Sequence, residues 1–94
     1  MKNIILVAML AEVYTEQSWD KDKKEYGLTR NAACDKACKE LGMVFDTVEL
    51  QVLYLLIHEC WNEIQDWFMH YFTFAVNIRY NDDDLIAYIK GVVN

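Results

Sequence analysis

The order of apolar and polar residues predicts helices over most of the chain, and the clearest pattern lies in its second half. From Leu50 to Ala75, apolar residues recur at steps of three and four, as on one face of an α-helix. A polar stripe runs along the opposite side at similar steps: Glu59, Glu63, Asp66, His70, Thr73 and Asn77. Asp46 and Glu49 form a capping-box pattern before this region. We therefore predict one long central helix that begins after Asp46.

Residues 3–17 are also predicted to be helical, although their apolar block would suit a buried strand. Glu12 and Glu16 lie one helical turn apart, behind a run of strong helix formers. Residues 72–80 can also be interpreted as either helix or strand, because strand-favouring residues alternate there with other types. A single strand is unstable, so residues 4–10 would be the natural partner of 72–80. We predict that both segments are helical; the alternative is an α+β fold with strands near 4–10 and 72–80.

Two shorter helices are marked by residues at their ends. One runs over Arg30–Leu41, with Thr29 or Asn31 as N-cap and Gly42 as a left-handed stop. The last helix has a cap and an acidic first turn in sequence: Asn81, Asp82, Asp83 and Asp84. Between the first two helices, charges of alternating sign over residues 18–27 predict a loop.

The length of 94 residues fits one domain, so we expect residues 1–94 to form a single small all-α domain, a compact bundle of about four helices. With 54% hydrophobic and 26% charged residues, the chain is not a disordered one. Three cysteines are an odd number, which favours a reducing compartment and hence the cytoplasm. No apolar stretch reaches the roughly 18–20 residues of a membrane span, so we expect no membrane contact.

The net charge of −6 is concentrated in one half of the chain. Residues 1–42 contain seven bases and seven acids, whereas residues 43–94 contain two bases and eight acids. An acidic balance argues against direct binding to nucleic acid, which needs a basic footprint. Several of these acids lie at predicted helix N-termini, where they stabilise the helix. An acidic surface could also steer towards a basic partner, such as the cleft of a nucleic-acid-handling protein.

Two sets of residues have side chains that could ligate a metal ion. Cys34, Cys38, His58 and Cys60 could make a zinc site, but His58 and Cys60 would point in nearly opposite directions on a helix. Buried cysteines acting as small apolar residues are the simpler interpretation. The second set lies on the polar stripe and could hold a divalent cation: Glu59, Glu63, Asp66 and His70.

The pair Glu63 and Asp66, with two residues between them, resembles half of the paired acidic motif of the all-α nucleotide pyrophosphohydrolases of the MazG type. The other half, on a facing helix, is missing. Glu12 and Glu16 are spaced by four, and Thr15 stands where the second acid should be. A solvated helix face explains the stripe as well. We therefore predict no metal and no cofactor, and keep a carboxylate-metal hydrolase as the second alternative function.

The sequence contains no pattern of catalytic residues, so we expect binding rather than catalysis. We predict a small intracellular regulator or inhibitor, forming a homodimer or higher oligomer, that docks on another protein through acidic and aromatic surface. A short, acidic chain without a pattern of catalytic residues also fits an accessory protein of a phage or mobile element. The expected partner-binding residues are Glu59, Glu63, Asp66, His70, Trp61, Trp67, Asp82, Asp83 and Asp84. The first alternative is an oligomeric small-molecule or nucleotide sensor, in which aromatic rings stack on a base and loop lysines meet phosphate: Lys21, Lys23 and Lys24.

Overall fold

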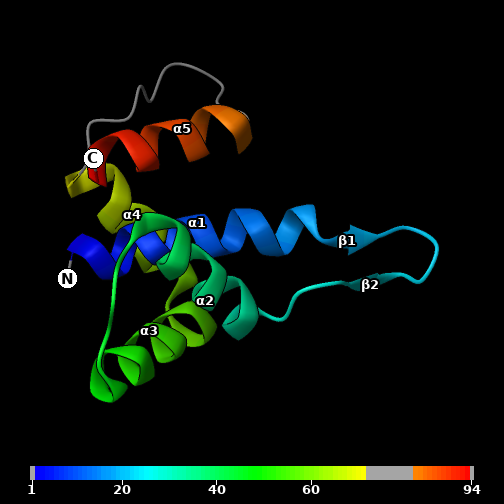
Figure 1. Ribbon diagram of the computed structural model, residues 1–94, viewed down its shortest axis with the longest axis horizontal. Helices are drawn as coiled ribbons and strands as arrows, with labels where there is room; N and C mark the ends of the chain where they lie inside the picture. Colours follow the sequence, from blue (N-terminus) through cyan, green and yellow to red (C-terminus); the bar gives the residue numbers. More distant parts are fainter. Residues whose placement is uncertain (1, 72–81, 94) are drawn as a thin grey trace.

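The structure, a computed structural model, describes residues 2–71 and 82–93, which form helices and one short hairpin (Figure 1). In chain order the elements are α1 Lys2–Gln17, β1 Trp19–Asp20, β2 Glu25–Tyr26, α2 Arg30–Leu41, α3 Thr47–Glu59, α4 Trp61–Tyr71 and α5 Asp82–Val93. The predicted all-α class is confirmed, and residues 4–10 are helical rather than a strand. The alternative strand at 72–80 lies outside the described residues, as does the proposed cap Asn81. Among the described helices, none has the length and apolar character that crossing a bilayer requires.

Helix α1 is the central helix of the bundle. It contacts α2, α3, α4 and α5, and Figure 1 shows it crossing the middle of the molecule. Every residue from Ile4 to Ala11 is buried. A helix that is apolar on all sides must be surrounded by other elements, whereas an amphipathic helix can lie at the surface. The prediction that the central helix lies in the second half of the chain is therefore wrong.

The single long helix predicted after the capping box is two helices, α3 and α4, separated at Cys60. Cys60 has φ −128° and ψ 35°, outside the α-helical region. Its N–H still donates to the Leu56 carbonyl at 2.8 Å, and its carbonyl accepts from the Ile64 N–H at 2.9 Å. The Ile57 carbonyl accepts a long hydrogen bond, 3.5 Å, from Arg30 Nη1 of α2. A side chain from another helix thus bonds to a backbone carbonyl at the break, which is a common cause of such interruptions.

The predicted ends of α2 and the start of α3 are confirmed. The Thr29 hydroxyl accepts from the backbone N–H of Ala32, and α2 stops at Gly42, whose φ of 67° suits glycine. At α3, the Asp46 carboxylate accepts from the N–H of Glu49 at 2.8 Å, and the Glu49 carboxylate accepts from the N–H of Asp46 at 3.2 Å. These local bonds satisfy N–H groups that a helix start would otherwise leave unpaired.

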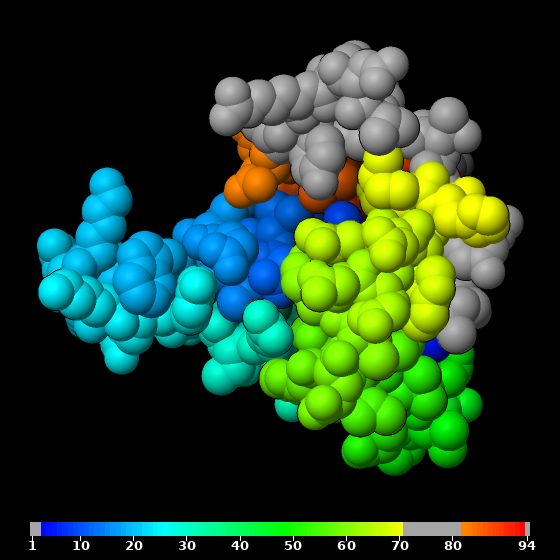
Figure 2. Space-filling model, turned by 180° about the vertical axis from the view of Figure 1, so that it is seen from behind, coloured from blue at the N-terminus to red at the C-terminus, as the bar shows by residue number. Residues whose placement is uncertain are grey.

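The segment predicted as a loop contains a short antiparallel hairpin, β1–β2, that projects from the helices (Figures 1 and 2). Trp19 pairs with Tyr26, and their rings meet edge to face with centroids 4.9 Å apart. The Asp20 carboxylate accepts from two backbone N–H groups of the turn. Aromatic pairing and this turn therefore order a charged segment that has few core contacts.

Candidate functional site: an acidic pocket between α1, α4 and α5

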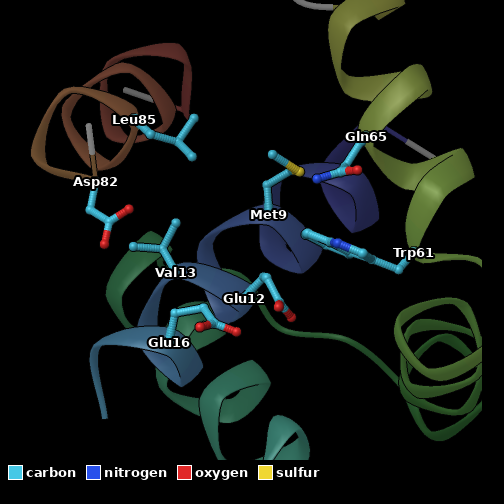
Figure 3. A pocket seen from close by; sticks show the side chains of 8 residues that line it. All are labelled: Met9, Glu12, Val13, Glu16, Trp61, Gln65, Asp82 and Leu85. Carbon is cyan, nitrogen blue, oxygen red and sulfur yellow. The ribbon is translucent and has the colours of Figure 1, made fainter. Parts of the chain in front are cut away.

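A cavity of about 120 Å³ lies where α1, α4 and α5 meet (Figure 3). Three carboxylates, one carboxamide and an indole ring line it together with three apolar side chains. The lining residues are Met9, Glu12, Val13, Glu16, Trp61, Gln65, Asp82 and Leu85. We call this cavity the acidic pocket.

Helical spacing places these side chains on the same cavity. Helix α1 contributes residues at positions i, i+3, i+4 and i+7: Met9, Glu12, Val13 and Glu16. Trp61 and Gln65 are one turn apart on α4, and Asp82 and Leu85 are three apart at the start of α5. Because α4 begins directly after the break at Cys60, Trp61 lies at the first position of α4. Elements distant in sequence are therefore needed to build the pocket.

Glu12 is the least exposed acid of the pocket. Its side chain is only 14% exposed, and its Oε2 atom is buried without a hydrogen-bond partner among the described residues. Arg30 Nε lies 3.7 Å from this oxygen and forms an ion pair with it. Burial raises the pKa of Glu12; Arg30 opposes this shift, and the neighbouring carboxylate of Glu16 adds to it. The acidic pocket thus brings three carboxylates together, and the Arg30 guanidinium offsets the charge of Glu12 in part.

No family model, curated protein or solved structure matches this chain.

Two of the nine residues predicted to bind a partner line the acidic pocket: Trp61 and Asp82. Asp83 and Asp84 are exposed in the same first turn of α5, beside the pocket rather than in its lining. Trp67 is half-buried and packs against the hydrophobic core. Trp61 is likewise half-buried and packed against the core, but it also lines the acidic pocket.

The predicted acidic stripe is divided by the break at Cys60. Glu63, Asp66 and His70 are exposed on α4, whereas Glu59 is the last residue of α3. Ile64 and Phe68, on the other side of α4, are buried. Glu63 and Asp66 therefore lie on the outer surface and do not face the two glutamates of α1, as a paired acidic motif would require. Within the described residues, no three His, Cys, Asp or Glu side chains are close enough to hold a metal ion.

The sequence did not identify Glu12, Glu16 and Gln65 as site residues. In the sequence, the two glutamates serve only as a pair one helical turn apart, which favours a helix over residues 3–17. The usable signal was the position of Glu12, which interrupts a stretch that is apolar on every side of the helix. A carboxylate in such a stretch must be at least partly desolvated, and perturbed acids cluster at functional sites.

The prediction that the cysteines are buried is confirmed for the two in α2 but not for Cys60. Cys34 and Cys38 are buried on the face of α2 that meets the core, and Cys60 is half-buried. Burial raises the pKa of the Cys34 thiol to about 12, and it also raises the pKa of Cys38. His58 lies 3.3 Å from the side-chain oxygen of Asn31. The two cysteines of α2 therefore act as apolar core residues with little thiolate character.

A second cavity, of about 330 Å³, lies at the base of the hairpin. It is lined by Thr15, Glu16, Tyr26, Leu28, Thr29 and Arg30. Glu16 lines both cavities, and the Glu12–Arg30 ion pair joins a residue of the acidic pocket to a residue of this second one. The charged side chains of the second cavity are of both signs, so this cavity is less selective for a cation than the acidic pocket is.

Proposed function

We propose that this protein is a small, non-catalytic regulator or inhibitor that captures a cationic side chain of a partner protein in the acidic pocket. The observation that carries this proposal is the combination of three carboxylates with the indole of Trp61 around one cavity. Carboxylates bind guanidinium and ammonium groups by charge-assisted hydrogen bonds, and an aromatic face attracts the same groups. The buried Oε2 of Glu12, which has no hydrogen-bond partner among the described residues, supplies an acceptor that such a group could satisfy.

The size of the acidic pocket favours a side-chain head group over a whole small molecule. Its volume of about 120 Å³ is smaller than the roughly 300–1,000 Å³ of typical ligand pockets. Arginine fits best among natural cations, because its planar guanidinium can bond to two carboxylates and stack on an indole. We therefore propose an exposed arginine of the partner as the group that enters.

Acidic residues outside the pocket support the approach of a basic partner. Asp83 on α5, and Glu63 and Asp66 on α4, are exposed, and the chain carries a net charge of −6. Such a surface raises association rates with a basic protein, for example one whose surface handles nucleic acid. The free thiols of all three cysteines suit a reducing compartment, so a cytoplasmic location belongs to the same proposal.

The test is a calorimetric titration with an arginine-rich peptide and a peptide of equal length in which citrulline replaces arginine. We expect the arginine peptide to bind, and to bind more weakly as salt rises, because surface charges are screened. The citrulline peptide should not bind, since it has the shape of arginine without its charge. If both peptides bind equally, or neither binds, the proposal is wrong.

Two neighbouring aspartates give a matched pair of variants that separates the pocket from general surface charge. Asp82→Asn changes a lining residue, whereas Asp83→Asn removes the same charge one position further along α5. Loss of a hydrogen bond to a charged group lowers binding by roughly tenfold. We expect that loss for Asp82→Asn and only a small change for Asp83→Asn. Equal effects of the two variants would indicate unspecific attraction to an acidic surface.

A small-molecule sensor is the second candidate function, because the second cavity has the volume of a ligand site. Tyr26 could stack on a planar ligand there, and Arg30 could bond to an anionic group. A thermal-shift screen with nucleotides tests this, since a ligand that binds only the folded state raises its stability by mass action. A melting temperature that does not move at millimolar nucleotide would exclude it.

A further inference from the structure

The second cavity, at the base of the hairpin, is lined by one acidic and one basic side chain. Glu16 comes from the last turn of α1, and Arg30 is the first residue of α2. Within the described residues no ion pair joins Glu16 to Arg30, which pairs instead with Glu12. The cavity therefore offers a carboxylate and a guanidinium that one ligand carrying both charges could bind at the same time.

Arg30 is suited to bind the anionic group of such a ligand. A guanidinium carries five N–H donors, and the contacts of Arg30 within the described chain are long. Its Nε lies 3.7 Å from Glu12 Oε2, and its Nη1 donates to the Ile57 carbonyl over 3.5 Å. The side chain is 38% exposed, so a ligand can reach it. The neighbouring Thr29 hydroxyl accepts from Ala32 N–H and can donate its own proton to a carboxylate.

The ends of the two helices favour the same arrangement of charges. The hairpin joins the C-terminal end of α1 to the N-terminal end of α2 (Figure 1). A helix C-terminus attracts a cation, and a helix N-terminus attracts an anion. The last turn of α1 contains no basic residue, and the first turn of α2 contains no acidic one. A ligand ammonium is therefore favoured beside Glu16, and a ligand carboxylate beside Arg30.

The rest of the lining and the size of the cavity indicate the remainder of the ligand. Leu28 and the ring of Tyr26 provide apolar surface for a side chain. The volume of about 330 Å³ is at the lower end of the range of ligand sites, roughly 300–1,000 Å³. A small zwitterion with one apolar side chain matches these features. The phosphates of a nucleotide would bring negative charge alone, which Glu16 repels.

We propose that the second cavity binds a free α-amino acid with an apolar or aromatic side chain. The carboxylate of the ligand bonds to Arg30 and Thr29, and its ammonium bonds to Glu16. The ligand side chain packs on Tyr26 and Leu28. The proposal goes beyond the capture of a partner's arginine, because Arg30 does not line the acidic pocket. It also assigns the cavity a ligand different from a nucleotide.

The test is a calorimetric titration of the full chain at pH 7 with L-phenylalanine and L-leucine, and with two analogues that keep the phenyl ring. The analogue 3-phenylpropionate lacks the ammonium, and 2-phenylethylamine lacks the carboxylate. We expect phenylalanine to bind with a Kd on the order of 0.1–1 mM. Each analogue should bind about tenfold more weakly, because each leaves one charged side chain of the cavity without its partner. Adenosine monophosphate should also bind more weakly than phenylalanine.

Variants of the two charged residues connect each ligand group to one side chain. Arg30→Gln and Glu16→Gln should each weaken phenylalanine binding about tenfold. Glu16→Gln should also bind 3-phenylpropionate as well as phenylalanine, and Arg30→Gln should bind 2-phenylethylamine as well as phenylalanine. A general loss of stability would not remove these preferences one at a time. Glu25→Gln, at an exposed position of β2 outside the lining, is the control and should leave the Kd unchanged.

Three results would overturn the proposal. The first is that neither phenylalanine nor leucine binds at about 10 mM, which is well above the expected Kd. The second is that both analogues bind as tightly as phenylalanine, since the two charges of the cavity would then play no part. The third is that adenosine monophosphate binds and the amino acids do not, which would favour the nucleotide sensor. Circular dichroism of the variants verifies that each is folded.

Discussion

Replacing Glu12 by glutamine should raise the free energy of unfolding at pH 7 by about 1 kcal/mol. A buried polar atom without a hydrogen bond costs about 1–3 kcal/mol, and Glu12 Oε2 is such an atom among the described residues. The ion pair with Arg30 returns at most about 1 kcal/mol, since the nitrogen–oxygen distance is 3.7 Å and the arginine side chain is 38% exposed. Glutamine keeps the shape of glutamate, and its amide can donate to the neighbouring Glu16. For a domain of this size, about 1 kcal/mol corresponds to roughly 4–8 °C in Tm.

The pH dependence of the stability gained by Glu12→Gln tests whether burial of the charged carboxylate is its cause. Burial raises the pKa of Glu12 above its ordinary value of 4.5, so the folded protein holds this proton more tightly than the unfolded chain does. Its contribution to stability therefore falls as pH rises from the unfolded pKa through the folded pKa, and stays low above it. Below 4.5 the carboxyl is protonated in both states. The advantage of Glu12→Gln should thus be largest at neutral pH and should shrink in acid.

Urea unfolding at pH 7 and near pH 4, followed by circular dichroism, measures the stability gained by Glu12→Gln and its dependence on pH. Glu59→Gln is the control, because it removes the same charge from an exposed position at the end of α3 and should change stability by less than about 0.5 kcal/mol. A Glu12→Gln protein that is less stable than the wild type at pH 7 would refute the reasoning. A gain of equal size at both pH values would also refute it, because protonation of Glu12 would then play no part.

Two further predictions follow from local structure. Asp46→Ala removes the acceptor of the capping box of α3 and should lower the free energy of unfolding by about 1 kcal/mol, measured by urea denaturation. With a thiol-specific reagent at pH 8, the half-buried Cys60 should react well before Cys34, whose thiol is buried and has a pKa of about 12; mass spectrometry of the partly labelled protein identifies the order. Equal rates at the two cysteines would show that the core around α2 opens readily.

Elements whose ends are set by neighbouring residues could be predicted from the sequence. Thr29 and Gly42 bound α2, and Asp46 caps α3, because a cap is a hydrogen bond or a backbone conformation within a few residues of the helix end. The same holds for the buried face of α2, whose apolar residues follow the helical period. Such features depend on short stretches of chain, and these are fully visible in a sequence.

Features that depend on distant segments could not be predicted in this way. The break at Cys60 coincides with a hydrogen bond from Arg30, which is 27 residues away from the carbonyl that accepts it. The polar stripe continues through the break without any change of period, so periodicity alone indicates one helix. The acidic pocket also depends on distant segments, because α1, α4 and α5 each supply only part of its lining. Trp61 and Asp82 were identified by residue type, but nothing in the sequence placed them near Glu12.

Glu12 affects both the stability and the proposed function of the protein. Helix α1 would be more stable with an uncharged residue at this position, since every residue from Ile4 to Ala11 before it is buried. A buried carboxylate that destabilises the fold is also one that a cation can satisfy, and a bound cation would then stabilise the fold by mass action. Stability and binding should therefore change in opposite directions in Glu12→Gln. If this variant melts at a higher temperature yet binds the arginine peptide as well as the wild type does, Glu12 is a buried charge with no part in recognition.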